Sequence, residues 1–338
     1  MIDSTKPHDV AALATMAVDI QLRVEEDYLS QHTLQKGLNN DITSDQMARM
    51  IAGKDLVRSP GGAGGNVVTG IAIRGGKSAL IGKIANDNDG RFFAERVCGH
   101  GVSFFPSIDP DHPTTSILVM TTPDAERTFA VLRGAGSHIQ PEDVDTHAIA
   151  SAKVCYIDSY IWPAPHGEDV IRHAAAIAKD SGSVLAIALN DVNITREFRS
   201  KMLGLISAQP CIIVGDQNEL MTLLDTRTLE ETYDAVKALG CITAFTHGKH
   251  GAYVTDGTHP FVHVPALIVK NVVDTSGAGD QFAAGFLYGL CQGKDPVDSA
   301  LIGHTWASAV IQHMGAEPQL SGNGPSNSQN HKQNFQLG

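Results

Sequence analysis

Seven consecutive residues have the types and spacing that phosphate chemistry needs: Asp274-Thr275-Ser276-Gly277-Ala278-Gly279-Asp280. The β-rich run over residues 261–273 predicts a strand before the heptad. The glycines predict a tight turn, and the run from Gln281 to Cys291 predicts an amphipathic helix directly after it. The backbone N–H groups of residues 276–279 would then surround a pocket for anionic oxygen, which the helix dipole favours. An acid beside that pocket suits a base that takes the proton from an attacking hydroxyl. The heptad therefore predicts phosphoryl transfer with Asp280 as the base; a well-capped core helix is the structural alternative.

A second glycine-rich run, Pro60-Gly61-Gly62-Ala63-Gly64-Gly65-Asn66, precedes a Gly75-Gly76 turn and a strand expected over residues 78–84. Together the two runs closely resemble the motifs of the PfkB (ribokinase-like) family of small-molecule kinases, D-T-x-G-A-G-D and G-G-x-x-x-N. The similarity extends from about Ala12 to Glu317. Within the family the chain looks most like bacterial adenosine kinase-like proteins, which implies an enzyme that uses ATP and Mg²⁺.

The resemblance implies a role for each matching residue. Asp280 would be the base, and the N–H groups of Gly277, Ala278 and Gly279 would hold the charge that develops on the γ-phosphoryl group. Arg127 matches the family's lid cation, a task that suits its fixed charge and planar fork, with a plain surface arginine as the alternative. The sugar-binding residues implied are Asp19, Gly61, Gly62 and Asn66. The ATP-binding residues implied are Asp216, Glu219, Thr246, Gly248 and Gly251.

Three positions depart from the family's pattern. Ala14 and Thr15 replace the Gly and Asn of G-N-x-x-x-D, a motif whose last residue, Asp19, is kept. In the family this carboxylate binds two sugar hydroxyls, because its two oxygens can accept hydrogen bonds from a cis-diol. Asp216 replaces the Asn of N-x-x-E, and an Asp at a helix start is also a good N-cap. These departures place one ribose contact and one ATP contact in question.

Candidate metal ligands come from the same resemblance. Glu219 would act on Mg²⁺ and phosphate through water, because a carboxylate near triphosphate helps only with a cation between them. Family members often use K⁺ beside the first motif, which makes the carbonyl groups of Asp274 and Ser276 candidate ligands. The pair His247 and His250 lies in the segment that resembles T-x-G-x-x-G, and two histidines in a polar turn predict solvent exposure rather than a metal site.

The run from Gly70 to Ser78 almost spells the phosphate-binding loop of nucleotide hydrolases. Its spacing is off by one residue, and a helix is expected before it with a strand after it. A phosphate-binding loop needs the reverse order of elements, so we reject this interpretation. A dinucleotide-binding fold also lacks support, because no G-x-G-x-x-G follows an expected strand.

The elements that must position these residues alternate along the chain. Strands are expected over residues 153–157, 183–189 and 211–214, and helices over 166–180, 195–206 and from 219 onward. This alternation predicts an α/β fold with an open, mostly parallel, ribokinase-like sheet and helices on both faces. Ligands bind outside the carboxyl ends of such strands, which places Asn190, Asp191 and Asp216 in a cleft.

Two regions break the alternation. Val18 to Val24 alternates apolar and polar residues, as do residues 114–122 and 127–132, which predict a hairpin. Periodicity alone indicates extra antiparallel strands at a sheet edge; the resemblance implies a small β lid over the sugar, from about 18–40 and 113–133. We expect one kinase domain over residues 1–320 and a flexible tail over 321–338, which is poor in apolar residues.

Composition narrows the classes of partner. The 338 residues include 25 Lys and Arg against 37 Asp and Glu, a net charge of −12 without a basic block. This balance argues against nucleic acids and acidic membranes as partners. Five scattered cysteines and the lack of a long apolar run predict a cytoplasmic, reduced protein without a membrane segment. Both a monomer and a homodimer remain open, because lid strands in this family can pair between subunits.

The best hypothesis is an ATP-dependent kinase that phosphorylates the 5′-hydroxyl of a nucleoside, with adenosine as the leading candidate. One alternative is a kinase for ribose, fructose or a related sugar, which would share the catalytic residues. Another is a nucleoside-binding protein that has lost turnover, which the departures at Ala14, Thr15 and Asp216 favour and the intact Asp280 disfavours.

Overall fold

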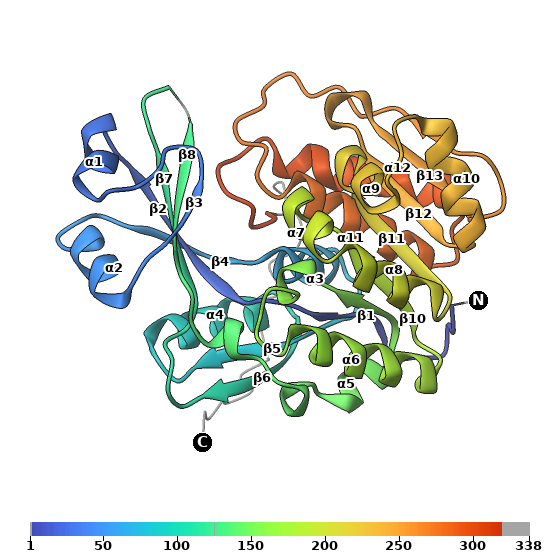
Figure 1. Cartoon of the computed structure of the whole chain (residues 1–338), viewed down its shortest axis with the longest axis horizontal. Coiled ribbons are helices and arrows are strands. Elements are labelled where there is room, and N and C mark those ends of the chain that lie inside the picture. Colours follow the sequence, from blue (N-terminus) through green and yellow to red (C-terminus); the bar gives the residue numbers. More distant parts are fainter. Residues whose placement is uncertain (1, 125, 320–338) are drawn as a thin grey trace.

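Two β-sheets organise the part of the chain that the computed structural model describes, residues 2–124 and 126–319 (Figure 1). The large sheet has the order β14 (Val262–Val264), β13 (Ala252–Thr255), β12 (Ile242–Thr246), β11 (Cys211–Asp216), β10 (Val184–Ala188), β9 (Ala152–Ile157), β1 (His8–Leu13), β5 (Ser78–Ala85), β6 (Ser103–Asp109). Neighbouring strands from β12 to β6 are parallel, and β13 and β14 are antiparallel. The predicted open, mostly parallel sheet is confirmed.

Helices cover both faces of this sheet, because its central strands are apolar on both sides. In β5 every residue is buried, as expected for a parallel strand between two helical layers. One face packs against α3 (Ala63–Ala72), α4 (Asn88–Gly99), α11 (Ala278–Cys291) and α12 (Pro296–Val310). The other packs against α5 (Thr146–Ala150), α6 (Gly167–Ser181), α8 (Arg199–Ser207), α9 (Gln217–Leu224) and α10 (Leu229–Leu239). None of the helices in the described ranges could cross a bilayer.

The strand order reverses beside β1. From β1 the chain adds β5 and β6 on one side, and from β9 onward it adds strands on the other. Loops from the carboxyl ends of β1 and β9 therefore leave in different directions, and a crevice at such a reversal is where open α/β sheets bind ligands. Helix α11 packs across β1, β9 and β11 on this part of the sheet.

The second sheet stands apart from the first (Figure 1). Its order is β3 (Asn39–Asp41), β8 (Arg127–Leu132), β7 (Ser116–Thr121), β2 (Ala17–Arg23), β4 (Val57–Gly61). The expected hairpin is present as β7 and β8, but β2 pairs with β7 in parallel, as β3 does with β8. The expectation from periodicity alone, antiparallel edge strands, was therefore wrong in two respects: the strands form their own sheet, and its pairing is mixed. The small second sheet that the resemblance implied is confirmed.

The two faces of the second sheet differ because its strands alternate. Ile20, Leu118 and Met120 point to one face, which α1 (Glu26–Gln31) and α2 (Ser44–Ile51) cover from outside. Ile117, Val119, Phe129 and Val131 occupy the opposite face and are half-buried. This opposite face, which we call the cleft face, also carries Asp19 and Arg127 and is turned toward the large sheet.

Three expectations about elements were wrong. Residues 261–273 form a strand only over Val262–Val264; Pro265, which has no N–H to donate, follows directly. The helix expected over 195–206 is split into α7 (Val192–Glu197) and α8 at Phe198. Helix α11 is not amphipathic: Gln281 to Cys291 is buried except at Tyr288, because α3 and α12 cover it. The tail expected to be flexible, 321–338, lies outside the described residues.

Candidate active site

The heptad starts helix α11 as predicted, and Gly277 is its N-cap. Gly277 has φ +73°, and a Cβ there would lie within 2.9 Å of Ala316. Both the backbone conformation and the close approach therefore require glycine at this position. Asp280 is the acid of the helix's first turn. Gly279 differs, because nothing lies within 4 Å of the position of its Cβ. The open space above Gly279 lies where a ligand would approach the helix start.

The pocket for anionic oxygen is smaller than predicted. The Ser276 N–H donates to Asp274 Oδ1 at 2.9 Å, and the Ala278 N–H donates to the Thr275 carbonyl at 3.2 Å. The prediction for the Ser276 N–H was therefore wrong, and the Ala278 N–H already has an acceptor. Within the described ranges the N–H groups of Gly277 and Gly279 have no hydrogen-bond partner. These two donors, with the positive end of the helix dipole, are the ones available to phosphate.

Asp280 meets Asn66 across the site. Asn66 Nδ2 donates to Asp280 Oδ2 at 2.9 Å, which joins residues from the two glycine-rich runs. Burial raises the pKa of Asp280 to about 6, and the hydrogen bond from Asn66 opposes this rise. A carboxylate with this pKa is ionised at neutral pH, and its pKa lies close to the pH at which it would work. A general base needs both properties.

Asp19 lies on the cleft face beside the same base. A Cβ on Gly61 would come within 2.3 Å of Asp19 Oδ1, so glycine at 61 leaves room for the carboxylate. Gly62 has φ +91°, and its Cβ would approach the Thr15 carbonyl oxygen to 2.4 Å. Burial and then the charge of Asp280 raise the pKa of Asp19 to about 7. Gly61, Gly62, Asn66, Asp19 and Asp280 are thus brought together.

Asp158 belongs to this group, although the sequence analysis missed it. It follows β9 directly and is fully buried, and its Oδ2 has no hydrogen-bond partner within the described ranges. Burial raises its pKa to about 7; the backbone N–H of Tyr160 opposes the rise and the charge of Asp280 adds to it. The rule that polar residues at strand ends line the cleft would have found it, had it been applied to β9.

The departures at Ala14 and Thr15 also lie here, at the end of β1. A Cβ on Gly64 would approach that of Ala14 to 2.4 Å, so Gly64 makes room for the methyl group of Ala14. The Oγ1 of Thr15 is buried and, within the described ranges, has no hydrogen-bond partner. A buried polar atom without a partner is costly, and a bound polar ligand would remove that cost. Thr15 and Asp158, which carry these oxygens without partners, lie just past the ends of β1 and β9, where the strand order reverses.

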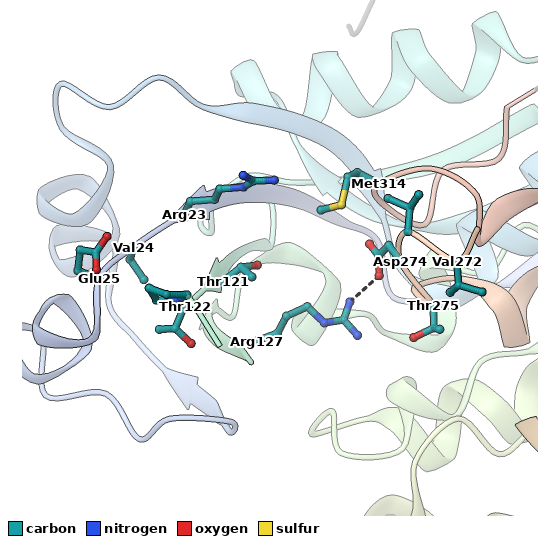
Figure 2. A pocket seen from close by; sticks show the side chains of 12 residues that line it. Arg23, Val24, Glu25, Thr121, Thr122, Arg127, Val272, Asp274, Thr275 and Met314 are labelled. Atoms are coloured by element: carbon teal, nitrogen blue, oxygen red, sulfur yellow. Dashed lines mark hydrogen bonds and ion pairs between the residues drawn. The ribbon is translucent and has the colours of Figure 1, made fainter. Parts of the chain in front are cut away.

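Arg127 reaches from the second sheet to the heptad. Its Nη1 lies 3.5 Å from Asp274 Oδ1 and contacts Ser276 Oγ. A pocket of about 720 Å³ lies beside this contact (Figure 2). Arg23, a residue that the sequence analysis did not single out, lines it as well. Arg23 pairs with Thr121 across β2 and β7, and Thr121 pairs with Arg127 across β7 and β8. Two arginines and a hydroxyl therefore form one row on the cleft face, opposite the heptad.

The predicted ATP-binding residues lie along the carboxyl ends of β11 and β12. Asp216 and Thr246 are register partners on these strands. Asp216 is the N-cap of α9: its Oδ1 accepts the Glu219 N–H, and Glu219 Oε2 accepts the Asp216 N–H, both at 2.8 Å. The capping alternative for Asp216 is confirmed, and its ATP contact stays a prediction. Gly248 and Gly251 have φ +54° and +110° in the turn before β13.

The polar residues expected at other strand ends have local roles. Asp191 caps α7 by accepting the N–H groups of Asn193 and Ile194. Asn190 has φ +58°, and its Oδ1 accepts the Ser159 N–H at 3.2 Å. The rings of His247 and His250 are 4.9 Å apart, and within the described ranges no three metal-binding side chains come together. Both histidine side chains are exposed to solvent, as predicted.

The residues present fit Mg²⁺ and K⁺ in different ways. Glu219 is buried, and this burial raises its pKa to about 7; the Asp216 N–H occupies only Oε2. A cation held mainly by phosphate oxygens and water suits a site with one carboxylate oxygen to spare. Asp274 is committed to Ser276 and, through Oδ2, to the Gly315 N–H. In the described ranges the carbonyl groups of Asp274 and Ser276 accept no backbone hydrogen bond, which leaves both oxygens for K⁺.

Comparisons with known proteins agree with this geometry. The model of the pfkB family of carbohydrate kinases matches residues 38–321. The solved structure of adenosine kinase from Sinorhizobium meliloti is 32% identical, with a TM-score of 0.83 over 93% of this chain and 97% of that one. Aminoimidazole riboside kinase from Salmonella typhimurium is 30% identical, over 69% of this chain and 74% of that protein. A 5-dehydro-2-deoxygluconokinase from Shouchella clausii is 27% identical, over 79% and 86%.

Proposed function

The chain belongs to the pfkB family of carbohydrate kinases, and from this membership we propose that it phosphorylates the 5′-hydroxyl of a nucleoside, with adenosine as the leading candidate. The reaction class is phosphoryl transfer from ATP to an alcohol. The observation that carries the proposal is the convergence of Asp19 and Asp280 on one glycine-rich run: Gly61 leaves room for the Asp19 carboxylate, and Asn66 donates to Asp280 Oδ2 at 2.9 Å. In the proposed function, a diol-binding carboxylate and a base would then face the same ligand.

The proposed reaction uses few protein groups. Asp280 takes the proton of the 5′-hydroxyl while the 5′-oxygen of the substrate attacks the γ-phosphorus atom of ATP. ADP is the leaving group. The N–H groups of Gly277 and Gly279 hold the charge on the phosphoryl oxygens, with Arg127 and Arg23 opposite them. Glu219 would hold Mg²⁺ through water beside the phosphates, and the bound cation would supply further charge neutralisation. Positioning and electrostatics then account for most of the catalysis, as in other phosphoryl transfers.

The cleft face supports a nucleoside over a free sugar. Ile117, Val119, Phe129 and Val131 present half-buried apolar surface there. A purine stacked on this surface would add apolar burial worth on the order of 2–3 kcal/mol, which a sugar cannot gain. The adenosine kinase from Sinorhizobium meliloti is among the relatives that share the fold and about a third of the sequence.

A coupled assay of ADP formation tests the substrate. The additional burial of about 2–3 kcal/mol corresponds to a preference of roughly 30- to 150-fold, since about 1.4 kcal/mol is a factor of ten. We expect kcat/KM for adenosine to exceed that for ribose or fructose by this factor. Inosine, guanosine and aminoimidazole riboside complete the series. Equal or better turnover of ribose, fructose or 5-dehydro-2-deoxygluconate would replace the nucleoside proposal with the sugar-kinase alternative.

Sugars are included in the assay because some of the relatives are named as sugar kinases.

If no compound is turned over, calorimetric titration with adenosine separates the remaining hypotheses. Binding of adenosine without turnover would support a nucleoside-binding protein. If adenosine is neither bound nor turned over, the nucleoside proposal is rejected.

A further inference from the structure

Helix α3 presents three residues, four positions apart, to the start of helix α11. They are Asn66, Gly70 and, just beyond the helix end, Arg74. Residues four apart lie one above another on a helix, so the three line one stripe of α3. Gly70 and Arg74 come from the run that almost spells a phosphate-binding loop, a motif for which the proposed reaction has no use.

Gln281 fills the groove along this stripe. Its side chain is fully buried, and its Nε2 donates to the Asn66 carbonyl at 2.9 Å. A Cβ on Gly70 would lie 2.5 Å from Gln281 Oε1 and 2.8 Å from Nε2. The bare backbone of Gly70 is therefore what lets the amide reach across to α3.

Arg74 closes the groove at its other end. Its Nη1 donates to Gln281 Oε1 at 3.0 Å and to the Gly70 carbonyl at 3.1 Å, and its guanidinium stacks 4.5 Å from the ring of Trp306. Burial lowers the pKa of Arg74 to about 10, which keeps it charged at neutral pH. Arginine has no acceptor and a carbonyl has no donor, so only one orientation of the Gln281 amide satisfies both neighbours.

The same groove ends at the catalytic base. Gln281 follows Asp280 directly, and Asn66 both accepts from Gln281 through its carbonyl and donates to Asp280 Oδ2 through its side chain. A shift of α3 relative to α11 would therefore break the contact with Gln281 and the contact with Asp280 together.

We propose that Gln281, locked by Arg74, is a positioning residue that fixes α3 against α11 and thereby orients the carboxylate of Asp280. With Oδ2 held by Asn66, Oδ1 is the oxygen turned to the hydroxyl of the substrate. The inference rests on the proposed function, in which Asp280 is the base. Misplacing a catalytic group by about 1 Å can cost roughly 10²-fold, so a lock of this kind has a measurable effect.

Gln281→Met tests the lock, because methionine has a similar length and volume but cannot make either hydrogen bond. We expect kcat to fall by about 10- to 100-fold, while KM for nucleoside and for ATP stays within about twofold. Gln281→Glu should behave like Gln281→Met, since it keeps an acceptor for Arg74 but loses the donor to Asn66. The matched control is Gln292→Met at the other end of α11, where the side chain bonds Asp9 Oδ1 at 3.2 Å; its kcat should not change.

The pH profile separates positioning from plain structural support. Weakening the Asn66 contact removes an interaction that lowers the pKa of Asp280. The acidic limb of kcat/KM should therefore move to higher pH in Gln281→Met and stay in place in Gln292→Met. A kcat within twofold of wild type, or an unmoved acidic limb, would overturn the proposal.

Gly70→Ala approaches the same contact from α3. Alanine favours a helix more than glycine does, so helix propensity alone predicts equal or better stability. The lock instead predicts lost kcat, because the new Cβ displaces the Gln281 amide; retained kcat would count against the proposal.

A measurement without turnover keeps this inference apart from the proposed function. In ¹⁵N spectra the side-chain amide of Asn66 should shift in Gln281→Met and not in Gln292→Met. If the wild-type protein lacks kinase activity but the shift is seen, the proposed function fails and the lock stands. If activity is present but neither kcat nor the amide signal responds, the lock fails alone.

Discussion

The junction of α3 with α11 and the cleft face of the second sheet would meet the same ligand in the proposed reaction, but they are built differently. At the junction, Asn66 and Gln281 are buried and held by hydrogen bonds within 3 Å. On the cleft face, Arg127 is about a third exposed and reaches the heptad over 3.5 Å to Asp274. In the proposed reaction, the geometry for the chemical step would be fixed where folding itself packs two helices, whereas the contacts that discriminate substrates would lie on a more open surface.

The largest effect should come from the junction. Asp280→Asn keeps the shape and the contact with Asn66 but removes the base, so kcat should fall by about 10²- to 10⁴-fold with binding nearly intact. Steady-state kinetics and calorimetric titration measure the two separately. The matched control is Asp298→Asn, the first-turn acid of α12, which should leave kcat unchanged. More than a tenth of wild-type kcat in Asp280→Asn would remove this residue from the role.

The pH dependence should also reflect the junction. The pKa of Asp280 is raised to about 6, and the base acts only when deprotonated. Activity should therefore fall as pH drops through 6, toward tenfold per pH unit. A rate profile of the wild type from pH 5 to 9 checks this, and constant kcat/KM down to pH 5 would contradict it.

On the cleft face the largest expected effect is that of Asp19→Ala. Hydrogen bonds to a charged group are worth about 1.5–3 kcal/mol, so nucleoside binding should weaken by roughly 10- to 150-fold, with ATP affinity unchanged. Titration with adenosine and 2′-deoxyadenosine measures it. Asp41→Ala, which removes an exposed acid from the same sheet, should have no effect. Equal losses for both nucleosides would argue against a contact with the 2′-hydroxyl.

Arg127→Ala should lower kcat by roughly tenfold, since a solvated cation is worth less than a buried donor. The effect should shrink at high salt, because the arginine is partly exposed. Arg133→Ala serves as the control at the other end of β8, where the arginine pairs with Asp41 at 2.9 Å. Similar kcat values in the two variants would show that Arg127 only joins the second sheet to the heptad.

The smallest effect should be that of Phe129→Ala, which removes one aromatic ring from the cleft face. Loss of a single aromatic contact, about 1 kcal/mol, should reduce the preference for adenosine over ribose by roughly fivefold. Parallel assays with both substrates measure the ratio. Val57→Ala, at an exposed position of the same sheet, is the control. An unchanged ratio in Phe129→Ala would place the base elsewhere.

Local chemistry explains what the sequence could predict. The turn at Gly277, the helix after it and the place of Asp280 depend on neighbouring residues, so the heptad alone was sufficient. The sequence did not show which glycine of the heptad the fold requires. Both glycines were expected to form the tight turn, but only Gly277 has a positive φ and a backbone neighbour, Ala316, contributed by a distant segment.

Long-range pairing explains what could not be predicted. Period-2 alternation indicates a strand but neither its partner nor its direction, so the parallel pairing of β2 with β7 was out of reach. The contacts of Asn66 with Asp280 and of Arg74 with Gln281 join residues more than 200 positions apart. A buried glutamine or arginine gives no periodic pattern that would reveal its partner.

The helices α1 and α2 on the outer face of the second sheet bear on how the protein behaves at dilution. Ile20, Leu118 and Met120 already bury their apolar side chains within the same chain, so this face does not need a second copy to shield it from water. An enzyme whose lid is completed by a partner loses specific activity as association is reversed by mass action. We expect the specific activity of this protein to be independent of its concentration, down to the nanomolar amounts used in an assay.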